Sequence, residues 1–341
     1  MWTTYRIHDL LTVHTNTSLP IPSYFVTEAD LPPPELSVHE TTEFDSTPPS
    51  YARRLASHHY WFDDGTLTVS YPSTPAGNPV AVQISDLHRT ETTLRYTPAF
   101  RQSVDFGELF EGILTVKLID ADVALVHAGA LADGDRATLL TSMGRMGKTS
   151  TILSILSTTD DVGFLGDNII LVDPDGWAYA WPATVGVFPG TAVSDEYLPS
   201  SERLRVKCKR ILANSDLLVA LLLHKFSRDL SESIEPTEFA RIMPQASIER
   251  IFVLNGGRLP TSDRNLSTSD LSAKVATGTD MELDPQNYYL SLYAFAGDAQ
   301  SVHPTQIKRR REDLIKQAFA EVERCELFAS DVSGYADRID L

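Results

Sequence analysis

The sequence predicts an α/β (α+β) protein in which a β-rich N-terminal region precedes a core built on a mixed β-sheet. Three observations support this class. Residues 1–103 read as short strands separated by proline, serine and acidic turns. Residues 137–156 give an apolar strand, a glycine-containing loop and an apolar helical segment in direct succession. Beyond them, short apolar runs alternate with turn residues, as they do in β-hairpins.

The N-terminal elements follow from residue type and spacing. β-Branched and aromatic residues predict strands over residues 60–62, 66–71, 80–84 and 92–96. A helix is predicted over residues 105–119, because apolar side chains recur there with helical spacing. These side chains are Phe106, Leu109, Phe110, Ile113, Leu114 and Val116.

The glycine-containing loop carries the strongest functional signal. Residues 142–149 read Ser-Met-Gly-Arg-Met-Gly-Lys-Thr, close to the pattern G-x-x-x-x-G-K-[ST] but with Ser142 where the pattern has glycine. A serine fits there if its φ angle stays negative. In such loops successive N–H groups and the helix N-terminus hold phosphate oxygens, and the lysine neutralises the β/γ oxygens. The predicted nucleotide-binding residues are Gly144, Arg145, Met146, Gly147, Lys148, Thr149 and Ser150. A turn whose glycines serve only backbone geometry is the alternative.

Further elements are predicted around the loop. A strand over 123–128 is expected to form a hairpin with the strand that enters the loop, and strands over 169–172 and 177–181 a second hairpin. Another strand is predicted over 162–165. Later in the chain we expect a helix within 203–228, a strand over 248–254 and a terminal helix over 305–327.

Phosphoryl transfer also needs Mg²⁺ and a group that orients the attacking hydroxyl. Thr149 can offer its hydroxyl to the metal, and Asp167 follows the loop by one helix and one connection. A tight Gly-Asp-Asn turn explains Asp167 equally well. His127 lies on an apolar strand, where a hydrogen-bonded core histidine is the more common case. Basic residues alternate over 203–210 and could clamp an anion or form surface ion pairs.

Composition limits the class of protein. The chain has 341 residues and a net charge of −17, which disfavours nucleic acid as a general partner. Only eight residues are lysine, a bias that a cytoplasm of high ionic strength or GC-rich coding could produce. The two cysteines, Cys208 and Cys325, form neither a disulfide framework nor a metal motif. With no signal peptide and no long apolar run, we expect a cytoplasmic protein without a membrane span.

The order of these motifs resembles a known family. His127-Ala-Gly, then the loop, then Gly166-Asp167-Asn168 before an apolar strand is similar to the C-terminal catalytic domain of HPr serine kinase/phosphorylase, whose fold is shared with ATP-dependent phosphoenolpyruvate carboxykinase. The resemblance covers about residues 105–255. It implies ATP and Mg²⁺ as cofactors, Lys148 on the phosphates, and Thr149 and Asp167 on the metal. It also implies that Asp167 acts on the acceptor hydroxyl and that His127 faces the phosphates.

Departures from the family pattern limit the activity and the substrate that we expect. Asn168 replaces the second acid and cannot act as a base, and a glycine-rich signature of the bifunctional enzymes is absent. We therefore expect a kinase that phosphorylates a hydroxyl of some other protein, peptide or small molecule, without phosphorolysis. A non-catalytic nucleotide-binding regulatory module is the alternative, and a carboxykinase-like metabolic enzyme ranks last.

The predicted domains are a β-rich region over 1–103, a kinase-like core over 104–300, and a C-terminal helix and tail over 301–341. HPr kinases form rings, so the resemblance implies a homo-oligomer.

Overall fold

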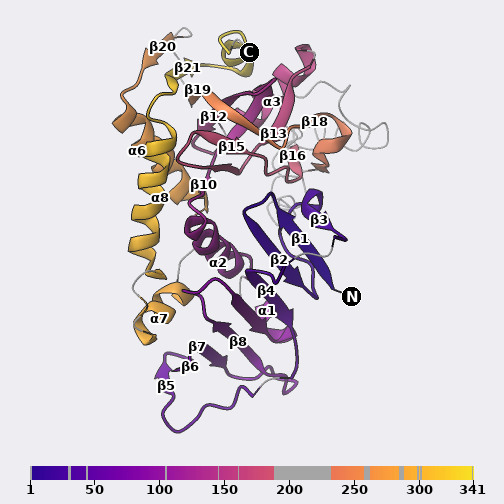
Figure 1. Cartoon of the computed structure of the whole chain (residues 1–341), viewed down its shortest axis with the longest axis vertical. Coiled ribbons are helices and arrows are strands. Elements are labelled where there is room, and N and C mark those ends of the chain that lie inside the picture. Colours follow the sequence, from indigo (N-terminus) through magenta and orange to yellow (C-terminus); the bar gives the residue numbers. More distant parts are fainter. Residues whose placement is uncertain are drawn as a thin grey trace, which may run out of the picture. The chain divides into compact units, whose positions relative to one another are not determined.

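A computed structural model of the chain (Figure 1) describes residues 2–29, 32–43, 45–103, 106–144, 146–159, 161–187, 232–256, 262–283, 288–297, 299, 302–339 and 341. By proximity the chain divides into two compact units, each of which gathers two stretches. The first comprises residues 1–125 and 283–314, and the second residues 126–282 and 315–341. The three-part division of the sequence stays a prediction.

The first unit contains a nine-stranded sheet with the order β3-β1-β2-β4-β9-β8-β7-β6-β5. Its pairs are antiparallel except for β2–β4 and β4–β9, which are parallel. The four strands predicted in this region are confirmed as parts of β6, β7, β8 and β9. The strands are β1 (Thr3–Ile7), β2 (Leu11–Thr15), β3 (Val26–Thr27), β4 (Leu36–Glu40), β5 (Arg53–Leu55), β6 (His58–Asp63), β7 (Thr66–Tyr71), β8 (Val80–Ser85) and β9 (Thr92–Tyr96).

Helices of the first unit include α1 (Pro98–Ser103), α2 (Phe106–Asp120) and α7 (Tyr288–Ala296). The helix predicted over 105–119 is confirmed as α2, whose apolar side chains are buried. Lys117 of α2 is buried as well, and its ammonium donates to the carbonyl oxygens of Arg89 and Thr90 at 2.6 and 2.8 Å. Lys117 therefore has a structural role, because its hydrogen bonds hold residues 89–90 against α2.

The second unit is built on a ten-stranded mixed sheet with the main order β10-β14-β15-β19-β12-β11-β13-β18. Strand β12 pairs in parallel with β19, which pairs in parallel with β21. Strand β11 lies antiparallel between β12 and β13. The strands are β10 (Ala124–Val126), β11 (Gly129–Asp133), β12 (Arg136–Ser142), β13 (Gly163–Gly166), β14 (Ile170–Val172), β15 (Trp177–Tyr179), β18 (Arg241–Ile242), β19 (Gln245–Gly256), β20 (Ser262–Asn265) and β21 (Glu323–Ala329).

The helices of this unit include α3 (Lys148–Thr158), α6 (Thr268–Leu283) and α9 (Val332–Ala336), and β16 (Val185–Val187) and β17 (Glu232–Ile234) form a separate pair. Most residues of α8 (Pro304–Ala318) belong to the first unit. Helix α3 packs into the main apolar cluster of this unit because one of its faces is aliphatic. The central residues of that cluster are Leu131, Leu140, Ile152, Leu153, Phe164, Leu254, Leu327 and Tyr335. The mixed α/β class is thus confirmed.

Two predicted elements differ from the structure. The hairpin partner of β12 is β11, so the strand predicted over 123–128 is shorter and separate. The terminal helix predicted over 305–327 is wrong beyond Ala318, because residues 323–329 form β21. The apolar edge of β19 takes β21 as its parallel neighbour, and this tertiary pairing overrides the local helical character. The second predicted hairpin is confirmed as β14–β15.

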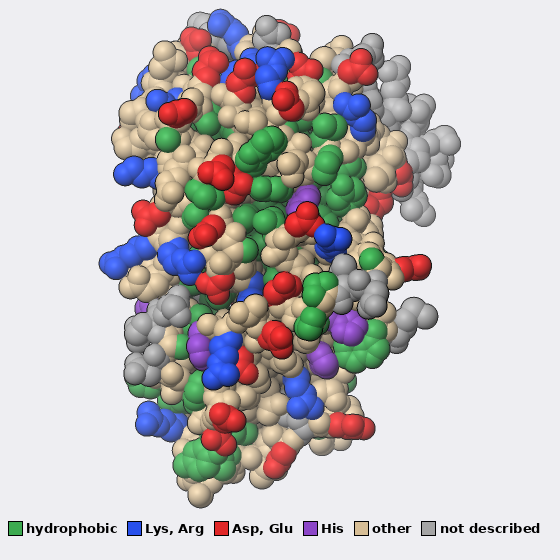
Figure 2. Space-filling model, viewed as in Figure 1, with side chains coloured by type: hydrophobic (Ala, Val, Ile, Leu, Met, Phe, Trp, Pro, Cys, Tyr) green, Lys and Arg blue, Asp and Glu red, His purple; other side chains and the backbone are tan. Residues whose placement is uncertain are grey.

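Some predictions fall outside the described residues. These are the helix within 203–228, the basic run 203–210, Cys208 and Arg145. Within the described part of the chain, none of the helices combines the length and apolar character needed to cross a membrane. On the face in Figure 2, lysine and arginine side chains lie among aspartate and glutamate side chains.

Candidate nucleotide and phosphoryl-transfer site

The predicted phosphate loop joins the C-terminal end of β12 to the start of α3. Among the described loop residues only Gly147 has a positive φ, 90°, and it caps the N-terminus of α3. Ser142 has no positive φ, so the serine that departs from the loop pattern is accommodated without strain. Gly147 instead occupies the left-handed region that favours glycine.

Lys148, Thr149 and Asp167 meet at the start of α3. The Lys148 ammonium donates to the main-chain oxygen of Asp167 at 2.5 Å. The Thr149 hydroxyl donates to Asp167 Oδ2 at 2.7 Å. Lys148 and Asp167 are 6% and 5% exposed. The structure therefore joins the loop to a carboxylate that lies 18 residues further along the chain.

Close backbone packing places Asp167 at the loop. Asp167 follows β13, which is parallel to β12 with β11 between them. Gly129, the first residue of β11, leaves no room for a side chain: a Cβ atom would lie 2.2 Å from Ile152 Cδ1 and 3.2 Å from the Asp167 oxygen. The glycine two residues after His127 thus lets the turn at Asp167 approach α3.

His127 is buried beside the same cluster. Its N–H donates to the Thr279 hydroxyl at 3.0 Å, and its carbonyl accepts from the Thr141 hydroxyl at 3.0 Å. Burial and the nearby Lys148 charge lower the pKa of His127 to about 4, against the opposing effect of the Asn168 carbonyl. The imidazole is therefore neutral at neutral pH. Its Nδ1 is buried without a hydrogen-bond partner among the described residues.

Asp167 has the character of a proton acceptor. Burial raises the pKa of its carboxyl group, and the Lys148 charge and the Thr149 hydroxyl only partly offset that rise. Its Oδ1 atom is also buried without a partner among the described residues. A buried, incompletely hydrogen-bonded carboxylate beside a phosphate loop is costly unless a ligand completes it.

The oxygen donors of this cluster suit Mg²⁺. Mg²⁺ is usually held in nucleotide sites by one or two protein oxygens together with phosphate oxygens and water. Thr149 Oγ1 and the Asp167 carboxylate are such oxygens, already within 2.7 Å of each other. No group of three or more histidine, cysteine, aspartate or glutamate ligands occurs in the part of the chain that is described. A metal at these two oxygens would therefore need further oxygen ligands from a bound group or from water.

The remaining predicted residues have different surroundings. Ser150 is buried in α3, and Met146 is 38% exposed. Asn168 is exposed, which leaves Asp167 as the only buried member of the Asp-Asn pair. Gly144 belongs to the described loop, whereas Arg145 lies outside the described residues.

Sequence reasoning missed a second polar cluster in this unit. The Glu326 side chain, on β21, is 2% exposed and binds Arg264, Lys274 and Asn255. Its sequence signal was a glutamate between Cys325 and Leu327, near the end of the helix predicted over 305–327. Asn255 and Lys274 also line a cavity with Ser142 and Met143 at the start of the loop.

Comparison with known proteins adds no assignment. The chain matches no protein-family model, and it matches no curated protein.

Proposed function

We propose that the chain is an ATP-dependent, Mg²⁺-requiring kinase that transfers the γ-phosphoryl group to a hydroxyl. The observation that carries this proposal is the convergence of Lys148, Thr149, Asp167 and His127, which come from three separate stretches of sequence. The resemblance to the HPr kinase catalytic domain assigns these residues to one site, and the contacts of Lys148 and Thr149 with Asp167 support that assignment.

The chemistry of each residue supports this function. The amides of the loop and the N-terminus of α3 would hold the phosphates, with Lys148 on the β and γ oxygens. Thr149 and Asp167 would hold Mg²⁺, which when bound offsets charge on the phosphate oxygens. The Asp167 carboxylate would take the proton of the attacking hydroxyl, since its raised pKa makes it a stronger base than an exposed aspartate.

His127 supplies a neutral group beside the phosphates. Because its pKa is lowered to about 4, the imidazole adds no charge that would compete with Lys148 for them. Its unpartnered Nδ1 can donate to or accept from a bound group, depending on the tautomer. We assign His127 to positioning of the phosphate chain.

One observation favours the non-catalytic alternative. The position where the related kinases carry a second acid is the exposed Asn168, so of this pair only Asp167 supplies a carboxylate. A regulatory module would need phosphate binding but no base. The two functions differ in the role they give to Asp167.

Two variants test the proposal. Lys148→Ala should weaken binding of a fluorescent ADP analogue by about tenfold or more, because a charge-assisted contact to phosphate is lost. Lys316→Ala, which removes an exposed lysine of α8, is the matched control and should bind normally. Equal binding by both variants would contradict the phosphate loop.

Asp167→Asn separates transfer from binding. It should bind the ADP analogue but lose transfer of labelled phosphate from ATP to an acceptor. Since burial raises the pKa of Asp167, the ionised carboxylate does not stabilise the fold at neutral pH, and the variant should remain folded. Transfer that persists in Asp167→Asn would exclude this residue as the base.

A further inference from the structure

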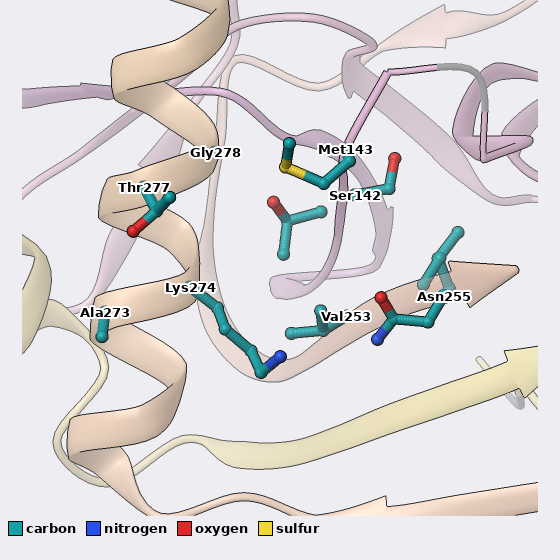
Figure 3. A pocket seen from close by; sticks show the side chains of 10 residues that line it. Ser142, Met143, Val253, Asn255, Ala273, Lys274, Thr277 and Gly278 are labelled. Carbon is teal, nitrogen blue, oxygen red and sulfur yellow. The ribbon is translucent and has the colours of Figure 1, made fainter.

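A cavity of about 290 Å³ adjoins the strand end of the phosphate loop within the second unit (Figure 3). Three elements form it. The end of β12 and the loop start contribute residues 141–143, the end of β19 contributes 253–255, and α6 contributes 273, 274, 277 and 278. This volume is at the small end of the range for ligand pockets, so it suits a small molecule.

One wall of the cavity carries a fixed arrangement of charges. The Lys274 ammonium and the Asn255 amide N–H both donate to Glu326 Oε1, at 2.8 and 2.6 Å, and Arg264 binds Oε2. Although burial alone would raise the pKa of Glu326, hydrogen bonds from Lys274 and Arg264 lower it overall, so it is ionised at neutral pH. Two cations thus surround one carboxylate, and the ammonium has further N–H groups for an anion.

The remaining lining is largely apolar. Met143, Val253, Leu254 and Ala273 contribute apolar surface to the cavity. In Figure 3 the Met143 side chain extends from the loop toward α6, above Val253, and Lys274 reaches in below it. A ligand with a short apolar body and one anionic group would match this lining.

Gly278 shows that part of the space is empty. It is buried in α6, yet a Cβ atom added there would meet nothing within 4 Å. A buried glycine with that much room faces the cavity. A Cβ atom therefore fits at this position, and a larger side chain there would extend into the cavity.

The cavity is next to His127. Thr141, on the cavity wall, donates to the His127 carbonyl, and Thr279 of α6 accepts from the His127 N–H. In the proposed function the phosphates of the nucleotide lie against the amides at the start of α3. The strand end of the loop, beside the cavity, would then remain open to an acceptor.

We propose that this cavity receives the acceptor and that the acceptor is a small hydroxy acid. This inference rests on the proposed kinase function. The carboxylate would bind Lys274, the carbon chain would contact Met143 and Val253, and the hydroxyl would extend toward Asp167. In the transfer the hydroxyl oxygen forms a bond to the γ-phosphorus, the bond from that phosphorus to the β–γ bridging oxygen breaks, ADP leaves, and the proton passes to Asp167.

Ligand-detected NMR tests the binding step without any need for turnover. The probes are glycerate, lactate and L-serine at millimolar concentration, with glycerol as the matched alcohol that lacks a carboxylate. At least one hydroxy acid should bind and glycerol should not. Lys274→Met should weaken that binding about tenfold or more, whereas Lys316→Met should leave it unchanged.

Gly278→Leu is the second variant, because loss of Lys274 could disturb Glu326. It should abolish binding of the hydroxy acid and keep the affinity for the ADP analogue within about twofold. If no probe binds, if glycerol binds as well as the acids do, or if both variants bind normally, the proposed acceptor is wrong. Failure of Lys148→Ala to weaken ADP binding would instead contradict the nucleotide site, so the two failures are distinguishable.

Discussion

At the scale of single residues, the candidate site contains buried polar side chains whose hydrogen-bonding atoms are not all paired. Asp167 Oδ1 and His127 Nδ1 are both buried without a hydrogen-bond partner among the described residues. Such groups cost free energy in a folded protein, and they are common where a ligand completes the site. These two residues, which lie outside the loop motif, therefore have a physical reason to bind a ligand.

His127 gives a prediction about pH. Its pKa is lowered from 6.5 to about 4 by burial and by Lys148, so the folded state binds this proton more weakly than the unfolded state does. Stability is unaffected above the unfolded value and falls as the pH drops from about 6.5 to 4. The loss amounts to roughly 3 kcal/mol.

Urea unfolding of wild type and His127→Gln measures this effect. Glutamine does not titrate, so the free energy of unfolding of the variant should decline less than that of wild type over the same pH interval. Other acids and histidines contribute equally to both curves. Parallel curves would show that His127 is not a buried neutral imidazole.

At the scale of elements, most of the local structure could be predicted from the sequence, and the errors have a common cause. Strands with clear alternation and α2 with its apolar period were predicted correctly. The strand β21 was not predicted, because residues 323–329 become a strand through pairing with β19, which lies about 70 residues earlier in the chain.

Alanine substitutions of Gly147, which precedes α3, and of Gly278, within α6, should change the stability of the protein in opposite directions. Gly147 has a φ of 90°, so Gly147→Ala should cost about 1–2 kcal/mol of stability and displace the loop. Gly278 lies inside α6 with open space for a methyl group, so Gly278→Ala should stabilise by about 1 kcal/mol. Thermal unfolding of the two variants provides this comparison, and a loss of stability in both would contradict the assigned geometry.

At the scale of the whole molecule, the sequence predicted candidate site residues that belong to a motif. It did not predict those that come together only in the folded chain. The loop motif and the resemblance led us to expect Lys148, Thr149 and Asp167 in one site, and the three residues are in contact. Lys274 and Glu326 have no such signal, since they are 52 residues apart and meet only because α6 and β21 both lie beside β19. No short sequence motif contains both residues, so this contact could not be predicted from the sequence.

The net charge of −17 gives the last prediction, which concerns salt. Like charges in a compact chain repel one another, and added salt shortens the range of that repulsion from about 10 Å at 0.1 M to about 3 Å at 1 M. The unfolding midpoint at pH 7 should therefore rise over a KCl series in this range. The chain's own isoelectric point, near 4.9, supplies the control. There the net charge is close to zero, so the same KCl series should leave the midpoint nearly constant. A rise of equal size at both pH values would mean that salt acts through ion exclusion or apolar burial, and a fall at pH 7 would mean that attractive ion pairs outweigh the repulsion.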